Sequence, residues 1–207
     1  MFEALILVLS VSIDSFLASI SYGTSKIKIP LRSALIIDII SSSMLGISLI
    51  IGGILQNYIS LNIAKAISFV VLFFLGFYRL FESLFKSYIN KKSKEVSPFK
   101  FKLFDFNFVL QVYANEIKAD FDKSKNLSSK ESIYLAFALS LDSLAVGFGS
   151  SLVTINYIEV FIFSLIIGLI VILFGSYLGK KFVDITSLNL SWLSGLMLII
   201  LAFLRAF

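Results

Sequence analysis

Six long apolar stretches follow one another along the chain, and short polar connectors separate most of them. The stretches cover residues 3–23, 31–55, 63–85, 132–152, 157–179 and 188–207. A helix needs about 20 mostly apolar residues to cross the hydrocarbon core of a bilayer. The pattern therefore predicts an all-α, polytopic membrane protein with six transmembrane helices.

One connector, residues 86–131, is much longer than the others. Apolar residues alternate with other residues there in two runs, Phe99, Phe101 and Leu103, and then Phe106, Phe108, Leu110 and Val112. A period of two predicts a short β-hairpin, placed here at the membrane interface. The alternative is an aromatic segment that lies among lipid headgroups without a fixed structure.

Basic residues indicate which connectors face the cytoplasm. They gather in three of the five connectors, as Lys26, Lys28, Arg32, Lys91, Lys92, Lys94, Lys100, Lys102, Lys118, Lys123, Lys125, Lys180 and Lys181. The opposite side carries only Lys65 and Arg205. Because positive residues stay in the cytoplasm, both termini are expected outside.

Composition agrees with a lipid environment and narrows the chemistry. The chain of 207 residues is 58% hydrophobic with a mean hydropathy of +0.96, more apolar surface than a soluble domain of this length hides from water. The net charge of +5 belongs to the cytoplasmic connectors, so it does not indicate a nucleic-acid partner. Without cysteine or histidine, a metal must be held by oxygen, which favours magnesium, calcium or manganese.

The two halves of the chain repeat one motif. Ser12-Ile13-Asp14-Ser15 in the first stretch matches Ser140-Leu141-Asp142-Ser143 in the fourth. We therefore divide the chain into a first repeat (1–85), a cytoplasmic loop (86–131) and a second repeat (132–207). Three spans per repeat place the second copy upside down, an arrangement typical of secondary transporters with a site near the midplane.

The repeated aspartates are predicted to share one depth in the membrane. Asp14 and Asp142 each lie about 15 Å from the start of their stretch, and no lysine or arginine lies at that depth. A lone carboxylate there costs several kcal/mol, about 3 or more. A divalent cation held by both, helped by Ser10, Ser15 and Ser143, would neutralise them. The alternative is two protonated aspartates, each hydrogen-bonded to a serine, that hold helices together.

These motifs, with Ser21-Tyr22-Gly23 and the run from Leu144 to Gly149, resemble the manganese efflux pump (MntP) family, and within it the sporulation membrane protein YtaF branch. The resemblance implies a six-helix exporter in the bacterial cell membrane, not an enzyme, with manganese as substrate and lipid as surroundings. It places Asp14 and Asp142 in the transport site. It leaves the oligomeric state open.

The second stretch departs from the family pattern. The pump proper carries an acidic residue deep in this helix, whereas here Asp38 lies nearer the cytoplasmic end and Ser41, Ser42 and Ser43 follow it. Asp38 is either a cation ligand on the cytoplasmic side of the transport site or an interfacial acid near Arg32.

The long loop holds a second candidate cation site. Oxygen-bearing residues stand at positions 1, 3, 5, 7, 9 and 12 of a twelve-residue window: Asp120, Asp122, Ser124, Asn126, Ser128 and Glu131. This spacing follows the EF-hand calcium loop, although position 6 is Lys125 instead of glycine. The alternative is a solvated linker that caps the following helix.

Two other functions compete with transport. An intramembrane aspartyl protease also needs two aspartates on two spans, but Asp142 lacks the Gly-x-Gly that usually precedes one of them. The second competitor is a non-transporting, sporulation-associated membrane protein that acts as a cation sensor or a scaffold.

Overall fold

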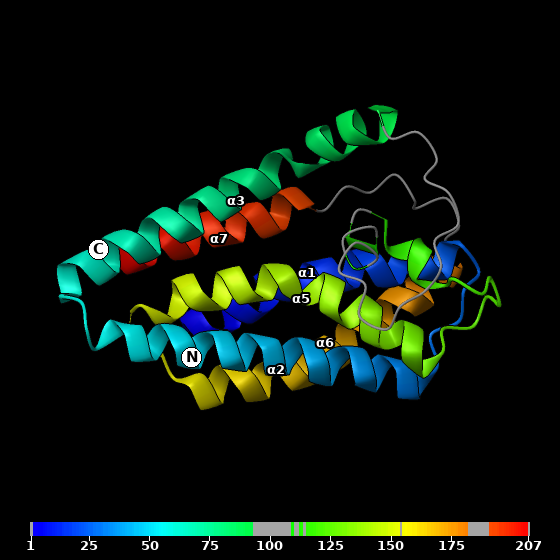
Figure 1. Cartoon of the computed structure of the whole chain (residues 1–207), viewed down its shortest axis with the longest axis horizontal. Helices are drawn as coiled ribbons and strands as arrows, with labels where there is room; N and C mark the ends of the chain where they lie inside the picture. Colours follow the sequence, from blue (N-terminus) through cyan, green and yellow to red (C-terminus); the bar gives the residue numbers. More distant parts are fainter. Residues whose placement is uncertain are drawn as a thin grey trace.

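The computed structural model describes residues 2–92, 109, 112–113, 115–153, 155–181 and 191–206, and these are almost entirely helical (Figure 1). The long helices are α1 (Phe2–Thr24), α2 (Leu31–Gln56), α3 (Leu61–Lys92), α5 (Ser129–Ser151), α6 (Tyr157–Lys181) and α7 (Ser191–Ala206). A short 3₁₀ helix, η1 (Glu116–Ala119), precedes α5. Within the described residues there is no strand, only one isolated parallel bridge between Lys28 and Asn126.

Among the described residues, five helices are long and apolar enough to cross a membrane. They are α1, α2, residues Leu61–Tyr78 of α3, α5 and α6. Their outward side chains include Ile54, Ile170 and Phe174, each more than half exposed, as expected for a surface that meets lipid. The sixth predicted span, 188–207, is represented by the 16 residues of α7, and its remaining residues lie outside the described part of the chain.

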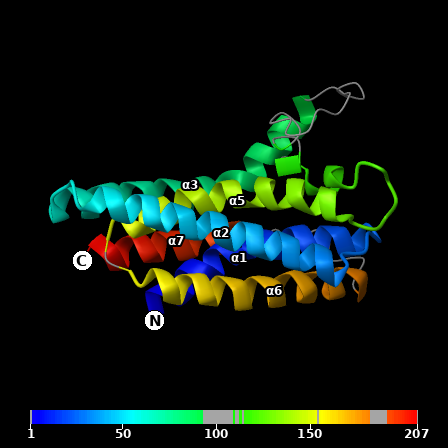
Figure 2. The same cartoon turned by 60° about the horizontal axis from the view of Figure 1, so that its bottom comes forward.

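The bundle has two distinct ends. The chain termini lie at the same end as the α2–α3 and α5–α6 connections, which we call the termini end (Figure 2). The α1–α2 connection and residues 115–128 lie at the opposite end, the connector end. The prediction that the termini end faces outward is not tested by this arrangement and stays a prediction.

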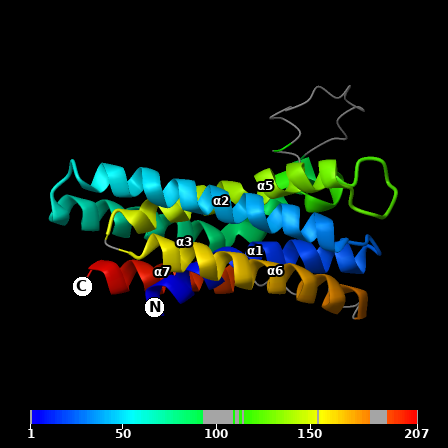
Figure 3. The same ribbon diagram turned by 90° about the horizontal axis from the view of Figure 1, so that it is seen from below.

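Each helix packs mainly against a helix from the other half of the chain. The pairs are α1 with α6, α2 with α5, and α3 with α7 (Figure 3). Glycines bring the first two pairs close, because a Cβ on Gly23 would collide with the backbone of Gly179 and one on Gly52 with Ser151. The α3–α7 pair instead packs rings, with Phe73 and Phe203 edge to face.

In the part of the chain that the structure describes, the buried core consists of two apolar clusters, one toward each end of the bundle. The connector-end cluster includes Tyr22, Ile37, Val112, Leu127, Leu135 and Ile172. The termini-end cluster includes Leu7, Leu45, Leu49, Val146, Val160 and Leu198. On α1, α2, α5 and α6, a polar layer therefore separates the two clusters near the middle of each helix.

The structure bears on two sequence predictions for the connector. The connector was predicted to begin at residue 86, but α3 continues to Lys92. Apolarity ends near Phe85, yet no glycine or proline follows until Pro98, so nothing in the sequence stops the helix there. The predicted hairpin, residues 99–112, falls almost entirely outside the described residues; Val109 and Val112, at its end, are helical.

Candidate functional site

The polar layer contains a small cavity between α1, α2, α5 and α6, which we call the serine cavity. Its lining residues are Val11, Ser12, Ser15, Asp38, Ser41, Ser42, Ser143, Ser164, Gly168 and Ile172. The volume is about 20 Å³, enough for one water molecule or one small ion. Seven lining residues carry a side-chain oxygen, and five of them, Ser12, Ser15, Asp38, Ser41 and Ser42, stand one helical turn from another, so α1 and α2 each present these oxygens on one face.

Asp38 is the acid that lines this cavity. It is only 4% exposed, so it lies inside the bundle, and both interpretations of Asp38 stay predictions. Gly168 on α6 makes its position possible, because a Cβ there would overlap Asp38 Oδ1. A buried carboxylate that faces hydroxyl groups across a small cavity is suited to bind a cation or a proton.

The serine hydroxyls form the remainder of the polar layer. Ser42 and Ser164 hydrogen-bond across α2 and α6, with 2.8 Å between their Oγ atoms. The Oγ of Ser41 is buried and has no hydrogen-bond partner among the described residues. The sequence did not predict four of the lining residues as site residues: Ser12, Ser41, Ser42 and Ser164. A serine in an apolar helix gives no signal of its role until the helix opposite is known.

The other predicted site residues lie in or beside this layer. Ser15 and Ser143 line the cavity, and each is the chain neighbour of a repeated aspartate. Asp14 and Asp142 are half-buried and are not among the lining residues. Successive helical residues point about 100° apart, so each aspartate faces a neighbouring side of its helix. Ser10 is buried and donates to the carbonyl of Leu7 at 2.7 Å.

Asp142 is reached by a residue from the long connector. The Tyr113 hydroxyl donates a hydrogen bond to Asp142 Oδ1 at 3.0 Å. This contact could not be predicted from the sequence, because the two residues are 29 positions apart and belong to different structural elements.

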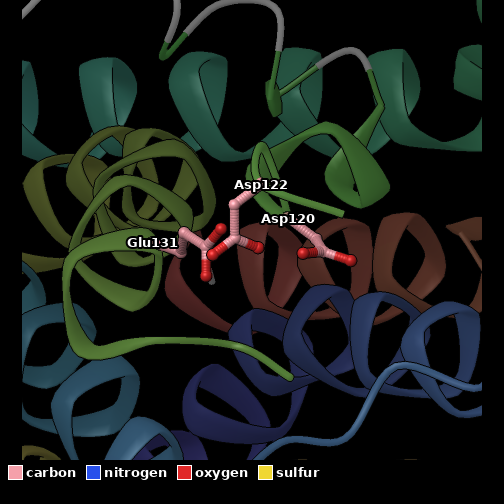
Figure 4. A group of neighbouring side chains, drawn as sticks. All are labelled: Asp120, Asp122 and Glu131. Atoms are coloured by element: carbon pink, nitrogen blue, oxygen red, sulfur yellow. The ribbon is translucent and has the colours of Figure 1, made fainter. Parts of the chain in front are cut away.

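The three membrane acids do not converge on one point in this conformation. Among the described residues, the group of acids whose carboxylate oxygens lie within 4.8 Å of one another is Asp120, Asp122 and Glu131, in the loop (Figure 4). Three of the predicted EF-hand-like positions, 1, 3 and 12, therefore do come together.

The loop backbone follows the predicted ligand spacing. Lys125, at position 6, has φ 59°, in the left-handed region where an EF-hand loop carries glycine. Asp120 Oδ1 and Asp122 Oδ1 both accept from the amide of Ser124, at 3.1 and 2.8 Å. The carbonyl of Asn126, at position 7, accepts from the hydroxyl of Ser124 at 3.0 Å and so points into the loop.

Part of the linker interpretation also holds, because the loop ends in the cap of α5. Ser128 and Glu131 form a capping box, in which the Ser128 amide donates to Glu131 Oε2 at 2.7 Å. Glu131 Oε1 also accepts from the amide of Phe121 at 3.1 Å. Glu131 is fully buried, so one carboxylate both starts the helix and closes the loop.

The two loop aspartates differ in their electrostatic surroundings. Burial raises the pKa of Asp120, and the negative charges of Glu131 and Asp122 add to this effect. Hydrogen bonds from Ser124 lower the pKa of Asp122, which is fully exposed. A cation bound between them would relieve the unfavourable charge on Asp120.

The loop is fastened to the first half of the bundle. Lys28, in the α1–α2 connection, donates its amide to the carbonyl of Lys125 and accepts from the amide of Leu127, each at 2.9 Å. The hydroxyl of Ser33 donates to the carbonyl of Leu127 at 2.6 Å. Leu127, at position 8, is buried in the connector-end cluster.

Comparison with known proteins identifies relatives along nearly the whole chain. The chain is 30% identical over 206 residues, 96% of each sequence, to "Probable sporulation protein YtaF" of Bacillus subtilis (strain 168). It is 25% identical over 196 residues to "Putative manganese efflux pump MntP" of Clostridium perfringens (strain 13 / Type A), covering 92% of this chain and 86% of that protein. No solved structure matches it. A family model described as "Putative manganese efflux pump" matches residues 51–204, and the chain therefore belongs to this Mntp family.

Proposed function

We propose that this protein exports a divalent cation, with manganese as the substrate, through the polar layer of the bundle. Membership of the efflux pump family supports a membrane transporter, a class of protein that is not an enzyme. The finer statement, which ion moves and through which residues, is our proposal. It includes the outward orientation of the termini end, since basic residues gather in the connectors of the connector end.

The observation that carries the proposal is a buried polar layer between two apolar clusters. Carboxylates and hydroxyls inside a membrane are costly unless they have a function or a partner. Here Asp38 and serines from four helices surround a cavity of ion-like size. The apolar cluster on either side separates that cavity from both ends of the bundle. This arrangement is expected of a transporter in an occluded state, in which the site is closed to both sides of the membrane.

The packing of the helices supports an inverted repeat. Two such halves are related by an axis that exchanges α1 with α5, α2 with α6, and α3 with α7. The exchange converts the α1–α6 pair into the α2–α5 pair, and it converts the α3–α7 pair into itself. The observed pairs meet both requirements.

In this mechanism the charges and the hydroxyls have different roles. Asp14 and Asp142 lie beside the cavity in equivalent motifs and supply two negative charges that balance a divalent cation. Asp38 and the cavity serines supply oxygens that replace part of its water shell. Oxygen ligands of this kind suit manganese or magnesium. A change in the packing of α1 on α6 and of α2 on α5 would bring the acids onto the ion.

The decisive experiment is transport of manganese, magnesium and calcium into proteoliposomes by purified protein. Asp14→Asn and Asp142→Asn each keep the shape of the side chain and remove one charge, so each is expected to abolish transport while the protein remains inserted and abundant. Asp38→Asn should weaken it. Glu159→Gln, at the start of α6 and outside the polar layer, is the control.

Two results would contradict the proposal. Transport at the wild-type rate in both Asp→Asn variants would place the site elsewhere. Failure of both variants to accumulate in the membrane would mean that the aspartates hold helices together, as in the hydrogen-bonded alternative.

A second candidate function is cation sensing by the loop, and the convergence of Asp120, Asp122 and Glu131 favours it. In this proposal calcium or manganese binds the loop from the cytoplasm, either to regulate transport or, in a protein without transport, to signal. The name of the Bacillus subtilis relative refers to sporulation, and the sensor could serve that process.

Calorimetry of the whole protein with calcium and with manganese tests the loop. Asp120→Asn should remove the heat of binding. Protons compete with the cation for Asp120, whose pKa is raised. As the pH is lowered, cation affinity should therefore begin to decrease at a pH above the usual aspartate pKa of about 4. Unchanged heat in Asp120→Asn would refute a loop site.

A further inference from the structure

Tyr113 contributes a hydroxyl from the long connector to one of the two repeated aspartates. Its hydroxyl donates to Asp142 Oδ1 at 3.0 Å, within the usual range for such bonds. Asp142 belongs to the motif that repeats Asp14. The contact therefore joins the long connector to the proposed transport site.

Residues before and after Tyr113 in the sequence contact the bundle and hold its phenol in place. Val112 is fully buried and Val109 nearly so, both in the connector-end cluster. The Tyr113 ring packs against the same cluster. Beyond it, the Tyr22 hydroxyl on α1 donates to the carbonyl of Glu116 at 2.6 Å, which ties η1 to the bundle.

We propose that Tyr113 sets the cation affinity of Asp142, because its hydroxyl and the cation compete for the same carboxylate oxygen. A hydrogen-bond donor stabilises a carboxylate that has no ion, and its proton repels a cation that approaches the same oxygen. Binding of the ion must displace or turn the phenol. Tyr113 is thus a positioning residue that keeps the affinity low enough for release. This inference rests on the proposed function.

The variant Tyr113→Phe removes the hydroxyl and keeps the ring that packs in the cluster. In proteoliposomes, the KM for manganese offered on the loop side should fall about fivefold, the effect of one lost competing hydrogen bond, while the maximal rate does not rise. Tyr134→Phe is the matched control, since Tyr134 on α5 packs against the same cluster. A merely structural tyrosine would change protein yield and maximal rate but not KM.

Direct binding separates this inference from the proposed function. Manganese binding to purified protein is measured by electron paramagnetic resonance, in a background with Asp120→Asn and Asp122→Asn that removes two of the three carboxylates of the loop. Tighter binding in Tyr113→Phe than in Tyr134→Phe upholds the inference, even if no variant transports and the proposed function fails. Equal affinity in the two variants, or no binding in either, overturns the inference whatever transport shows.

Discussion

At the scale of single residues, the polar layer depends on one glycine opposite one acid. Gly168 lies where any side chain would overlap the Asp38 carboxylate, so the two positions form a matched pair across α2 and α6. Because of this pair, Asp38 can lie inside an apolar bundle with only 4% of its surface exposed. The identity of residue 168 therefore matters for the site and not only for helix packing.

Gly168→Ala is predicted to impair transport without preventing insertion. The added methyl group would push the Asp38 carboxylate out of the serine cavity, and a displacement of about 1 Å in a positioned group can cost a tenfold or greater loss of rate. Manganese flux in proteoliposomes measures the effect. Gly46→Ala is the control, because its Cβ would meet only the Phe161 ring, at 3.3 Å. Equal flux in the two variants would contradict a role for Asp38.

Lys125→Gly is predicted to tighten cation binding by the loop. Lys125 adopts φ 59°, a conformation that costs a non-glycine residue about 1 kcal/mol, so glycine should bind roughly fivefold more tightly. Calorimetry with calcium measures the change. Lys125→Gln removes the same charge but keeps the strained backbone, and an equal gain in that variant would show that charge alone is responsible.

The acids of the candidate site could be predicted from the sequence, but their surroundings could not. A carboxylate in an apolar run is conspicuous, so Asp14, Asp142 and Asp38 could be named at once. The burial of Asp38 depends on which helix lies opposite it. The pattern of apolar residues in α2 does not specify the neighbouring helix. The Tyr113–Asp142 contact could not be predicted for the same reason.

At the scale of elements, apolar length predicted the helices well and their ends less well. The bounds of α1, α2 and α6 agree with the predicted stretches to within two residues. Helix α5 begins three residues early, because the capping box of Ser128 and Glu131 starts it before the apolar run. Helix α3 runs on to Lys92 because polar residues also form helix when no glycine or proline intervenes.

Gly23→Ala is predicted to weaken the packing of α1 on α6. Its Cβ would lie 2.6 Å from the carbonyl oxygen of Ser176 and 2.8 Å from the backbone of Gly179, and a backbone cannot rotate away. Overpacking of this kind should cost about 1–3 kcal/mol and lower the midpoint of thermal unfolding in detergent by about 2–10 °C. A midpoint as high as that of Gly46→Ala would contradict the predicted collision.

At the scale of the whole molecule, the two ends of the bundle differ in charge. Among the described residues, the connector end carries the α1–α2 connection with Lys26 and Lys28, residues 115–128 with Lys118, Lys123 and Lys125, and the end of α6 with Lys180 and Lys181. The termini end carries short connections with few basic residues. The structure separates these two sets of connections by the full length of the helices. The bundle can therefore take one of two orientations in the membrane, and the difference in positive charge between its ends favours one of them.

Asn57→Cys and Lys118→Cys are predicted to react from opposite sides of the membrane. Both positions are exposed, they lie at the termini end and the connector end, and the chain has no other cysteine. A membrane-impermeant maleimide should label Asn57→Cys in intact cells, and Lys118→Cys only in inside-out vesicles. Labelling of Lys118→Cys in intact cells would overturn the orientation.

The pairing of helices across the two halves has a consequence for how the protein can be made. Because α1, α2 and α3 each have their main partner in α6, α5 and α7, a chain that ended after α3 would leave its glycine-lined faces uncovered in lipid. The halves behave toward each other as two subunits of a dimer that happen to share one polypeptide. Separately translated halves should be degraded when produced alone and should accumulate together when produced in the same cell.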